Sequence, residues 1–342
     1  MNNALIILSV FLLSAGLTWY LSHPASKLRI LDEPNARSLH KIPVPRTGGL
    51  AIIVGVLFGS IPLAFEKVAI PGLVTVVVGG ALIATVSFLD DRSGLSAKIR
   101  LLVQLVAALL VVFAGRLLPD VFELPAWQWS WPPAVSVVVT VLFLLWMTNL
   151  YNFMDGMDGF AGGMAVFGFI AYAVLGWSAG DALFTLVSLV VAASAAGFLI
   201  FNYPPARIFM GDAGASVLGF LSACLAIWAA NEKMFPIWVG ILVFSPFVVD
   251  ATVTLLKRLL AGQKVWEAHR SHYYQRLVQL GWGHRKTVMW EYALMLAAAL
   301  SGCAAVFLPP QGQWLLIIVW CFVYLGLGLG VRGMESDTMR SG

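Results

Sequence analysis

Three short segments, each where a long apolar run meets a loop, carry aspartate side chains that could do chemistry. One segment, FLDDRSG, contains the adjacent pair Asp90 and Asp91. A second, NLYNFMDGMDG, contains Asp155 and Asp158, and a third, IFMGDAGAS, contains Asp212. Carboxylate oxygens are the ligands that Mg²⁺ prefers in proteins. The pattern therefore predicts a site for a hard cation and a phosphorylated substrate.

The pair Asp90 and Asp91 is expected at the C-terminal end of a helix, where the negative end of the helix dipole opposes both charges. Arg92 and Lys98 are nearby cations, and a bound metal ion would offset the charges better. Successive helical residues point about 100° apart, so one aspartate can face a site while the other pairs with a cation. A solvated acidic pair is the simpler alternative.

A polar series recurs every three residues in NLYNFMDGMDGFAGG, and its members are Asn149, Asn152, Asp155 and Asp158. Neighbours in such a series stay close on a helix or in a tight turn. Two amides followed by two carboxylates suit a ligand with donors, such as a nucleobase or a sugar, and help to hold a cation. The glycines of the segment permit tight turns.

Asp212 is flanked by Gly211 and Gly214 and directly precedes an apolar run. We predict that it is a metal ligand on a glycine-flanked turn, and the alternative is a helix cap. Two nearby residues suit recognition of a base, because Asn202 offers hydrogen bonds and Phe209 offers a ring for stacking.

Two basic segments are candidates for binding phosphate groups. The first, LDEPNARSLHKIPVPRTGG, contains Lys41 and Arg46, and its prolines exclude a helix. The second, AHRSHYYQRL, contains His269, Arg270 and His272, which suit a pyrophosphate. The two histidines could also bind a transition metal, but the carboxylates elsewhere suit a hard cation better. The alternatives are a loop held by anionic headgroups and a basic interfacial helix.

The apolar composition of the chain predicts that membrane-spanning elements position these residues. The chain has 342 residues, of which 60% are hydrophobic and 11% charged, against about 25% charged in soluble proteins. A membrane is therefore its natural solvent, and we expect no nucleic-acid partner. Eleven apolar runs are long enough to span a bilayer. They lie near 3–22, 48–65, 70–89, 99–118, 133–150, 160–179, 182–201, 214–230, 235–257, 288–308 and 313–331.

The distribution of positive charge predicts the orientation. With the N-terminus outside, the inner segments hold 18 of the 21 Lys and Arg residues, and the outer segments hold Lys67, Arg116 and Lys233. This asymmetry favours an outer N-terminus and a cytoplasmic C-terminus. The carboxylate segments then fall on the cytoplasmic side. We expect an all-α membrane protein that forms one catalytic domain over residues 1–342, without strands because the apolar runs are long and do not alternate.

The motifs PNARSLHKIPVPRTGG, FLDDRSG, NLYNFMDGMDG and IFMGDAGAS, in this order, resemble those of the bacterial polyprenyl-phosphate N-acetylhexosamine-1-phosphate transferases. The phospho-MurNAc-pentapeptide translocase is a more distant relative of that family. The resemblance implies Mg²⁺-dependent transfer of a sugar phosphate from a UDP-N-acetylhexosamine to undecaprenyl phosphate, with release of UMP. It implies an enzyme of the bacterial inner membrane that initiates O-antigen or another cell-envelope polysaccharide, with Mn²⁺ as a substitute metal and a homodimer as one possible assembly.

The resemblance also implies roles for individual residues. It places Asp90 and Asp91 near the lipid phosphate and the metal, and it makes Asp212 a ligand of Mg²⁺. We interpret Asp90 or Asp91 as positioning the metal and the nucleophile, because a phosphate monoester with a second pKa of ~6 is already largely a dianion at neutral pH.

The remaining implied roles concern the nucleotide. The positions that match are Asn152, Asp155, Asp158, Phe209 and Lys41. The family often has a His-x-His-His motif where this chain has HRSHYY, so the roles of the two histidines and the identity of the sugar stay open.

A transporter is the main alternative from another class of protein. Transporters carry charged residues near the bilayer midplane on broken helices. Asp250, in SPFVVDATVT, is the candidate for such a residue. A membrane scaffold without catalytic activity would not need the glycine-flanked carboxylates. Release of UMP would distinguish the transferase from both alternatives.

Overall fold

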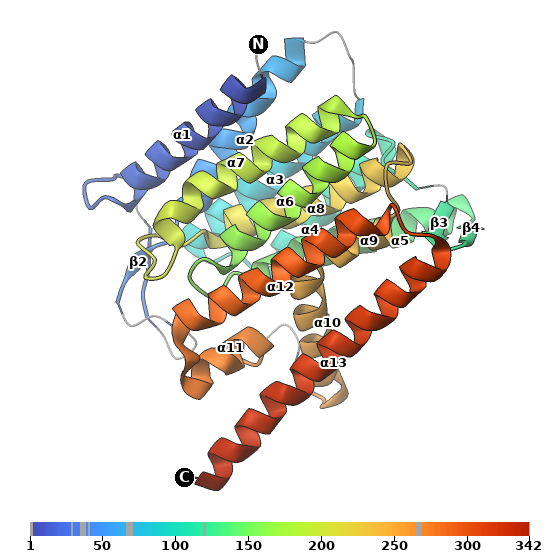
Figure 1. The fold of residues 1–342 in the computed structure, drawn as a ribbon. Coiled ribbons are helices and arrows are strands. Elements are labelled where there is room, and N and C mark those ends of the chain that lie inside the picture. The colour runs from blue at the N-terminus through green and yellow to red at the C-terminus, as the bar shows by residue number, and fades with distance from the viewer. Residues whose placement is uncertain are drawn as a thin grey trace.

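The computed structural model of the chain describes residues 3–28, 30–34, 39, 42–65, 71–119, 121–264 and 269–341. These residues form a bundle of long helices (Figure 1). In the first half the helices are α1 Asn3–Ser22, α2 Gly48–Phe65, α3 Pro71–Ser93, α4 Ala97–Phe113, α5 Pro133–Met154 and α6 Phe160–Ser178. In the second half they are α7 Ala182–Asn202, α8 Gly211–Asn231, α9 Ile237–Val243, α10 Ser245–Leu260, α11 Tyr273–Leu277, the π-helix Val278–Trp282, α12 Gly283–Ala305 and α13 Pro310–Ser341.

The all-α membrane fold is confirmed, and each of the eleven apolar runs is helical over most of its length. Eight helices of the described chain are long and apolar enough to cross a membrane. A ninth span is formed if α9 and α10 count as one, although they are bent by 87°. The helix α2 is apolar over a shorter stretch, and α4 has 17 residues. The count of eleven spans and the orientation stay predictions.

Helix α8 lies at the centre of the bundle, with 89% of its apolar window buried, and it packs against α2, α3 and α5. Small residues allow this close packing, as is common between membrane helices. A Cβ on Gly219 would lie 2.3 Å from the carbonyl oxygen of Met147 on α5. The N-terminal end of α8, which carries Asp212, is therefore held firmly against its neighbours.

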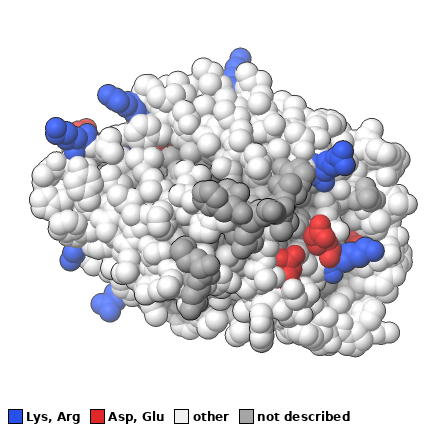
Figure 2. Space-filling model, turned by 90° about the horizontal axis from the view of Figure 1, so that it is seen from above, with Lys and Arg blue, Asp and Glu red and all other residues white. Residues whose placement is uncertain are grey.

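The outer surface of the bundle is apolar, as a lipid-facing surface must be. Figure 2 shows one face of the molecule, where the charged side chains of the described residues are few. Most of the basic ones lie near the edges, and acidic side chains gather beside a basic one on one part of the face. Only 11% of the apolar window of α13 is buried. Its exposed side chains are large and hydrophobic, and they include Leu315, Ile318, Val319, Phe322, Leu325 and Leu329.

Two short antiparallel strand pairs lie in the loops, where the sequence analysis expected none. The strands β1 Leu31–Asp32 and β2 Val44–Pro45 pair in the first basic segment, and β3 Val121–Leu124 pairs with β4 Trp127–Ser130. In Figure 1, β2 and α11 lie at one end of the bundle and β3 and β4 at the other. Loop sequences this short carry too little alternation to predict a strand.

The start of α2 is joined to the start of α8. The N–H of Gly48 donates to the carbonyl of Phe209 at 3.0 Å, and the N–H of Gly49 donates to that of Met210 at 2.8 Å. A Cβ on Gly49 would lie 2.4 Å from the Cα of Gly214. This backbone contact brings the first basic segment to the end of the helix that carries Asp212.

We expect Gly49→Ala to destabilise the protein by about 1–3 kcal/mol, because the added methyl group forces the two helix ends apart. The measurement is the thermal unfolding midpoint of the purified protein in detergent. The matched control is Gly80→Ala in α3, where an added Cβ meets nothing within 4 Å. Equal midpoints for the two variants would contradict the role given to this contact.

Candidate active site

Arg100, in the first turn of α4, joins two of the predicted site carboxylates. Its Nη1 donates to Oδ2 of Asp90 at 2.8 Å and to Oδ2 of Asp212 at 3.2 Å. The short loop between α3 and α4 makes this possible, because the N–H of Leu95 donates to Oδ1 of Asp90 at 2.6 Å and Ser96 caps α4. The arginine therefore ties the end of α3 to the start of α8.

Arg46 holds the second aspartate of the pair. Its Nε lies 3.6 Å from Oδ1 of Asp91, its guanidinium also donates to the main-chain carbonyl of that residue, and its Nη1 lies 3.9 Å from Asp32. Asp91 is only 6% exposed. The backbone of Gly211 passes close by with φ +76°, and a Cβ there would lie 2.3 Å from the Arg46 carbonyl and 3.0 Å from Asp91 Oδ2. Only glycine fits this position.

The C-terminal end of α5 adds an amide and a further carboxyl group. Asn152 hydrogen-bonds the Asp212 carboxylate, and Asp155 caps the helix beside it. Burial, followed by the negative charges of Asp212 and Asp91, raises the pKa of Asp155 to about 8, although a hydrogen bond from the Gly211 N–H lowers it. Carboxylates from the ends of α3, α5 and α8 therefore share one site with two arginines.

This donor set fits Mg²⁺, which the resemblance implies. The site offers carboxylate oxygens, and its aspartates Asp90, Asp91 and Asp212 outnumber Arg46 and Arg100. Burial, followed by the negative charges of Asp212 and Asp91, raises the pKa of Asp155 beside them. Within the described residues no three His, Cys, Asp or Glu side chains form a group that could hold a metal by themselves. Mg²⁺ usually binds through one or two carboxylates plus substrate phosphates and water, so a complete protein cage is not required.

The polar series of α5 does not form one surface. Asn149 donates to Gln104 at 2.7 Å and so joins α5 to α4 one turn deeper in the bundle. Asp158, beyond the helix end, accepts from the N–H of Ala206 at 3.0 Å and pairs with His284 of α12 at 3.0 Å. The helix ends before Asp155, so the three-residue spacing no longer keeps the later side chains on one face.

Asn202 is buried between two loops and is only 3% exposed. Its Oδ1 accepts from the N–H of Gly159 at 3.0 Å, and its Nδ2 donates to the carbonyl of Ile208 at 2.9 Å. Tyr292 donates to the carbonyl of Gly159 at 2.8 Å. Asn202 and Asp158 thus join the loops around the site. The direct roles predicted for them with the substrate or in catalysis stay predictions.

Phe209 is half-buried, and its main chain bonds to the first basic segment on both sides. Its N–H donates to the carbonyl of Pro45 at 2.7 Å, next to Arg46. The structure thus places Phe209 at the site, where its predicted stacking on a base stays a prediction. Lys41 lies outside the described residues.

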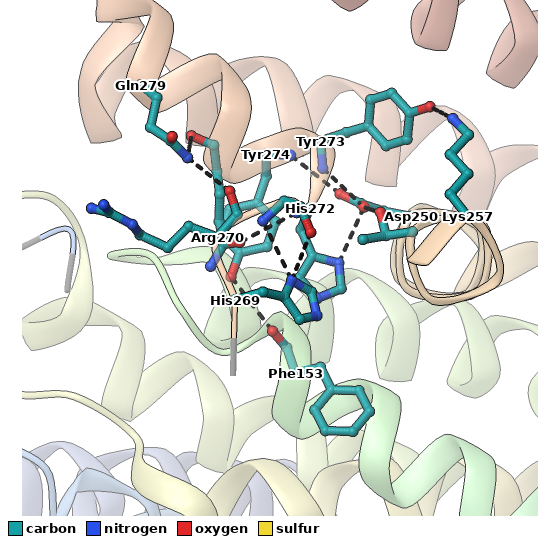
Figure 3. Close-up of polar contacts among 12 residues, drawn as sticks. Phe153, Asp250, Lys257, His269, Arg270, His272, Tyr273, Tyr274 and Gln279 are labelled. Atoms are coloured by element: carbon teal, nitrogen blue, oxygen red, sulfur yellow. Dashed lines mark hydrogen bonds and ion pairs between the residues drawn. The ribbon is translucent and has the colours of Figure 1, made fainter. Parts of the chain in front are cut away.

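The HRSHYY segment leads into α11, whose first two residues are the two tyrosines, and it contacts the end of α5 (Figure 3). The hydroxyl of Tyr274 lies 3.5 Å from the carbonyl of Phe153. His272 is buried, while Arg270 is exposed and its side chain points away from Asp250. Burial, helped by the electrostatic effect of the neighbouring His272 and Arg258, lowers the pKa of His269 to about 4, so the His269 imidazole is neutral at neutral pH.

The fold and the site define a multi-pass α-helical membrane protein with a carboxylate and arginine site at the helix ends. Residues 73–230 match the model of the family described as glycosyl transferase family 4. The chain is 32% identical over 324 residues to a Bacillus subtilis strain 168 protein, an alignment that covers 92% of this chain and 88% of the relative. That relative is named "Probable undecaprenyl-phosphate N-acetylglucosaminyl 1-phosphate transferase". The chain therefore belongs to glycosyl transferase family 4, which confirms the family resemblance.

Other relatives cover similar shares. A decaprenyl-phosphate N-acetylglucosaminephosphotransferase of Mycobacterium tuberculosis strain H37Rv is 28% identical over 88% of this chain and 83% of its own length. An undecaprenyl-phosphate alpha-N-acetylglucosaminyl 1-phosphate transferase of Escherichia coli strain K12 is 22% identical over 95% of this chain and 90% of its own length. The similarity thus extends over nearly the whole chain.

Sequence reasoning missed two site partners. It considered Arg92 and Lys98 as partners of the aspartate pair, but Arg100 is the partner of Asp90 and also pairs with Asp212. The short loop between α3 and α4 was the signal that could have identified Arg100, because such a loop brings the first turn of α4 close to the last turn of α3. His284 was not predicted to meet Asp158, because 126 residues separate the two in sequence and no local pattern joins them.

We expect Asn202→Ala to destabilise the protein, because it leaves the Gly159 N–H and the Ile208 carbonyl buried without a partner, at roughly 1–3 kcal/mol for each group. Thermal unfolding in detergent measures the effect. The control is Asn231→Ala, which removes only an exposed 3.5 Å contact to the Arg116 carbonyl. An equally small change in both variants would show that Asn202 does not hold these loops.

Proposed function

We propose that this protein transfers N-acetylglucosamine 1-phosphate from its UDP-linked donor to a polyprenyl phosphate and releases UMP. The relatives' names supply the sugar phosphate and the acceptor. The observation that carries the proposal for this chain is the joint binding of Asp90 and Asp212 by Arg100, with Arg46 on Asp91, at the ends of apolar helices. A lipid phosphate and a water-soluble nucleotide sugar can both reach such a site.

In the reaction, an oxygen of the polyprenyl phosphate attacks the phosphorus that bears the sugar. The bond from this phosphorus to the bridging oxygen breaks, and UMP leaves with the electron pair. Negative charge grows on the departing phosphate, and guanidinium groups stabilise it well through paired hydrogen bonds. Arg46 and Arg100 are suited to this task, since Asp91 and Asp90 hold their guanidinium groups in place before the substrates bind.

Mg²⁺, when bound, would neutralise negative charge on the diphosphate of the donor. Asp212, Asp90 and Asp91 are the residues that would hold it, with Asp155 beside them. Asn152 keeps the Asp212 carboxylate oriented through its hydrogen bond. Acting together, these residues place the phosphorus of the donor next to the acceptor.

The acceptor needs little help with deprotonation. Its phosphate is a monoester with a second pKa of ~6, so it is mostly a dianion at neutral pH. Asp91 is bound to Arg46 and nearly buried, which suits a residue that positions other groups. We therefore assign Asp90 and Asp91 to positioning, with the site on the cytoplasmic face of the bacterial inner membrane, where UDP-sugars are available.

The membrane fold follows from the acceptor. A polyprenyl tail stays in hydrocarbon while its phosphate rests in the headgroup plane, so a site at the ends of membrane helices can reach the phosphate. A transporter would place its charged residues deeper, near the midplane. Asp250, the candidate for such a residue, hydrogen-bonds the N–H groups of Tyr273 and Tyr274 at the start of α11.

We expect purified protein in detergent to release UMP from UDP-N-acetylglucosamine only when both undecaprenyl phosphate and Mg²⁺ are present. Chelation should stop the release, and added Mg²⁺ or Mn²⁺ should restore it. Asp212→Ala should lower the rate by about 100-fold, because the site loses a carboxylate that faces Arg100. UMP formed without the lipid, or at the same rate in the variant, would contradict the proposal.

Asp91→Ala should lower the rate to a similar extent at about pH 7 and at about pH 9, because the phosphate of the acceptor is already ionised at both. If Asp91 were a general base, hydroxide would replace it at high pH and the variant would recover there. The measurement is the pH profile of kcat for wild type and variant. Recovery of the wild-type rate at the higher pH would show that Asp91 removes a proton.

A further inference from the structure

The carboxylate of Asp250, on α10, lies against the start of α11 (Figure 3). Its Oδ1 accepts from the N–H of Tyr273 and the hydroxyl of Thr254, both at 3.0 Å, and lies 3.3 Å from Nδ1 of His272. Its Oδ2 accepts from the N–H of Tyr274 at 3.2 Å. A carboxylate that is 10% exposed needs such partners, because a buried charge without them costs several kcal/mol.

These contacts make Asp250 the cap of α11. The first N–H groups of a helix lack partners within the helix, and a carboxylate satisfies them and also meets the positive end of the dipole. The capping box adds a bond from the N–H of His272 to the side chain of Gln275 at 3.3 Å. The amides at the start of α11 are therefore already used within the protein, so they do not bind the phosphate of a substrate.

The cap also decides where Arg270 lies. His272, two residues after Arg270, is held by Asp250. The carbonyl of Arg270 itself accepts a hydrogen bond from Nε2 of Gln279 at 2.9 Å. The backbone of Arg270 is thus held from two directions, while its exposed side chain points away from Asp250 (Figure 3). Its guanidinium is therefore exposed and not engaged with the carboxylate of Asp250.

The same segment is tied to the site. The Tyr274 hydroxyl lies 3.5 Å from the carbonyl of Phe153, two residues before Asp155. A Cβ on Gly156 would lie 2.2 Å from that hydroxyl, so the loop after α5 and the start of α11 are in close contact. A shift of α11 would move Arg270 relative to the site carboxylates.

We propose that Asp250 is a positioning residue, which holds the start of α11 against the end of α5 so that the Arg270 guanidinium meets the diphosphate of the nucleotide sugar. The role of Arg270 rests on the proposed function, whereas the anchoring of α11 by Asp250 does not. Asp250 itself touches no substrate.

The test compares Asp250→Ala with Asp181→Ala in the full-length protein. Asp181 caps α7 by accepting from the N–H of Phe184 at 2.8 Å, and it lies at the other end of that helix from the site loops. Each variant thus loses one capping carboxylate. We expect Asp250→Ala to raise the KM for UDP-N-acetylglucosamine about tenfold with an unchanged KM for undecaprenyl phosphate, while Asp181→Ala keeps both constants.

A double-mutant cycle then separates positioning from general damage. In an Arg270→Ala background, Asp250→Ala should cost little further activity, because the group that it positions is already gone. A full additional loss in that background would overturn the proposal. So would a change in Asp250→Ala no larger than that in Asp181→Ala.

Hydrogen exchange distinguishes failure of this proposal from failure of the proposed function. Amides of residues 271–277 should exchange faster in Asp250→Ala than in wild type, and Asp181→Ala should leave them unchanged. If wild-type protein releases no UMP, the proposed function fails and with it the role of Arg270, while faster exchange still supports the anchor. Unchanged exchange in this segment overturns the anchor whatever the activity.

Discussion

The whole site depends on holding several carboxylates close together at the edge of an apolar bundle. Like charges at such short range repel each other, and the surrounding apolar helices weaken solvation. Arg100 and Arg46 offset part of this charge, and each joins elements that are far apart in sequence. Burial, followed by the negative charges of Asp212 and Asp91, raises the pKa of Asp155 at the same place. The cation that we propose for this site would offset the charge that the two arginines leave.

Close backbone contacts make that arrangement rigid. The first basic segment reaches the start of α8 only because Gly49 meets Gly214, and Gly211 turns beside Asp91 where a side chain would not fit. Around this centre a second set of polar residues holds the loops. Asn202 and Asp158 belong to that set, since their described hydrogen bonds and ion pairs go to protein groups.

The chemistry of the site and the membrane fold support each other. The acceptor proposed for this protein has a tail that belongs in hydrocarbon and a phosphate that belongs in water, so its reaction has to occur at a helix end. The contacts of Asp212 with Arg100 and Asn152, and of Arg100 with Asp90, bring the end of α3, the end of α5 and the start of α8 together. The bend between α9 and α10 then turns the chain so that Asp250 can hold α11 over this end.

Composition and the length of the apolar runs were sufficient to predict the membrane, the helices and the carboxylate segments at their ends, because these depend on local sequence. Which side chains meet was decided by the tertiary structure. The three-residue spacing from Asn149 to Asp158 suggested one ridge, but the helix ends before Asp155 and the series divides among three partners. Arg100 and Asp250 took their roles from helices that pack across the bundle. A sequence pattern records the period of one element, whereas such contacts arise only when separate elements pack together.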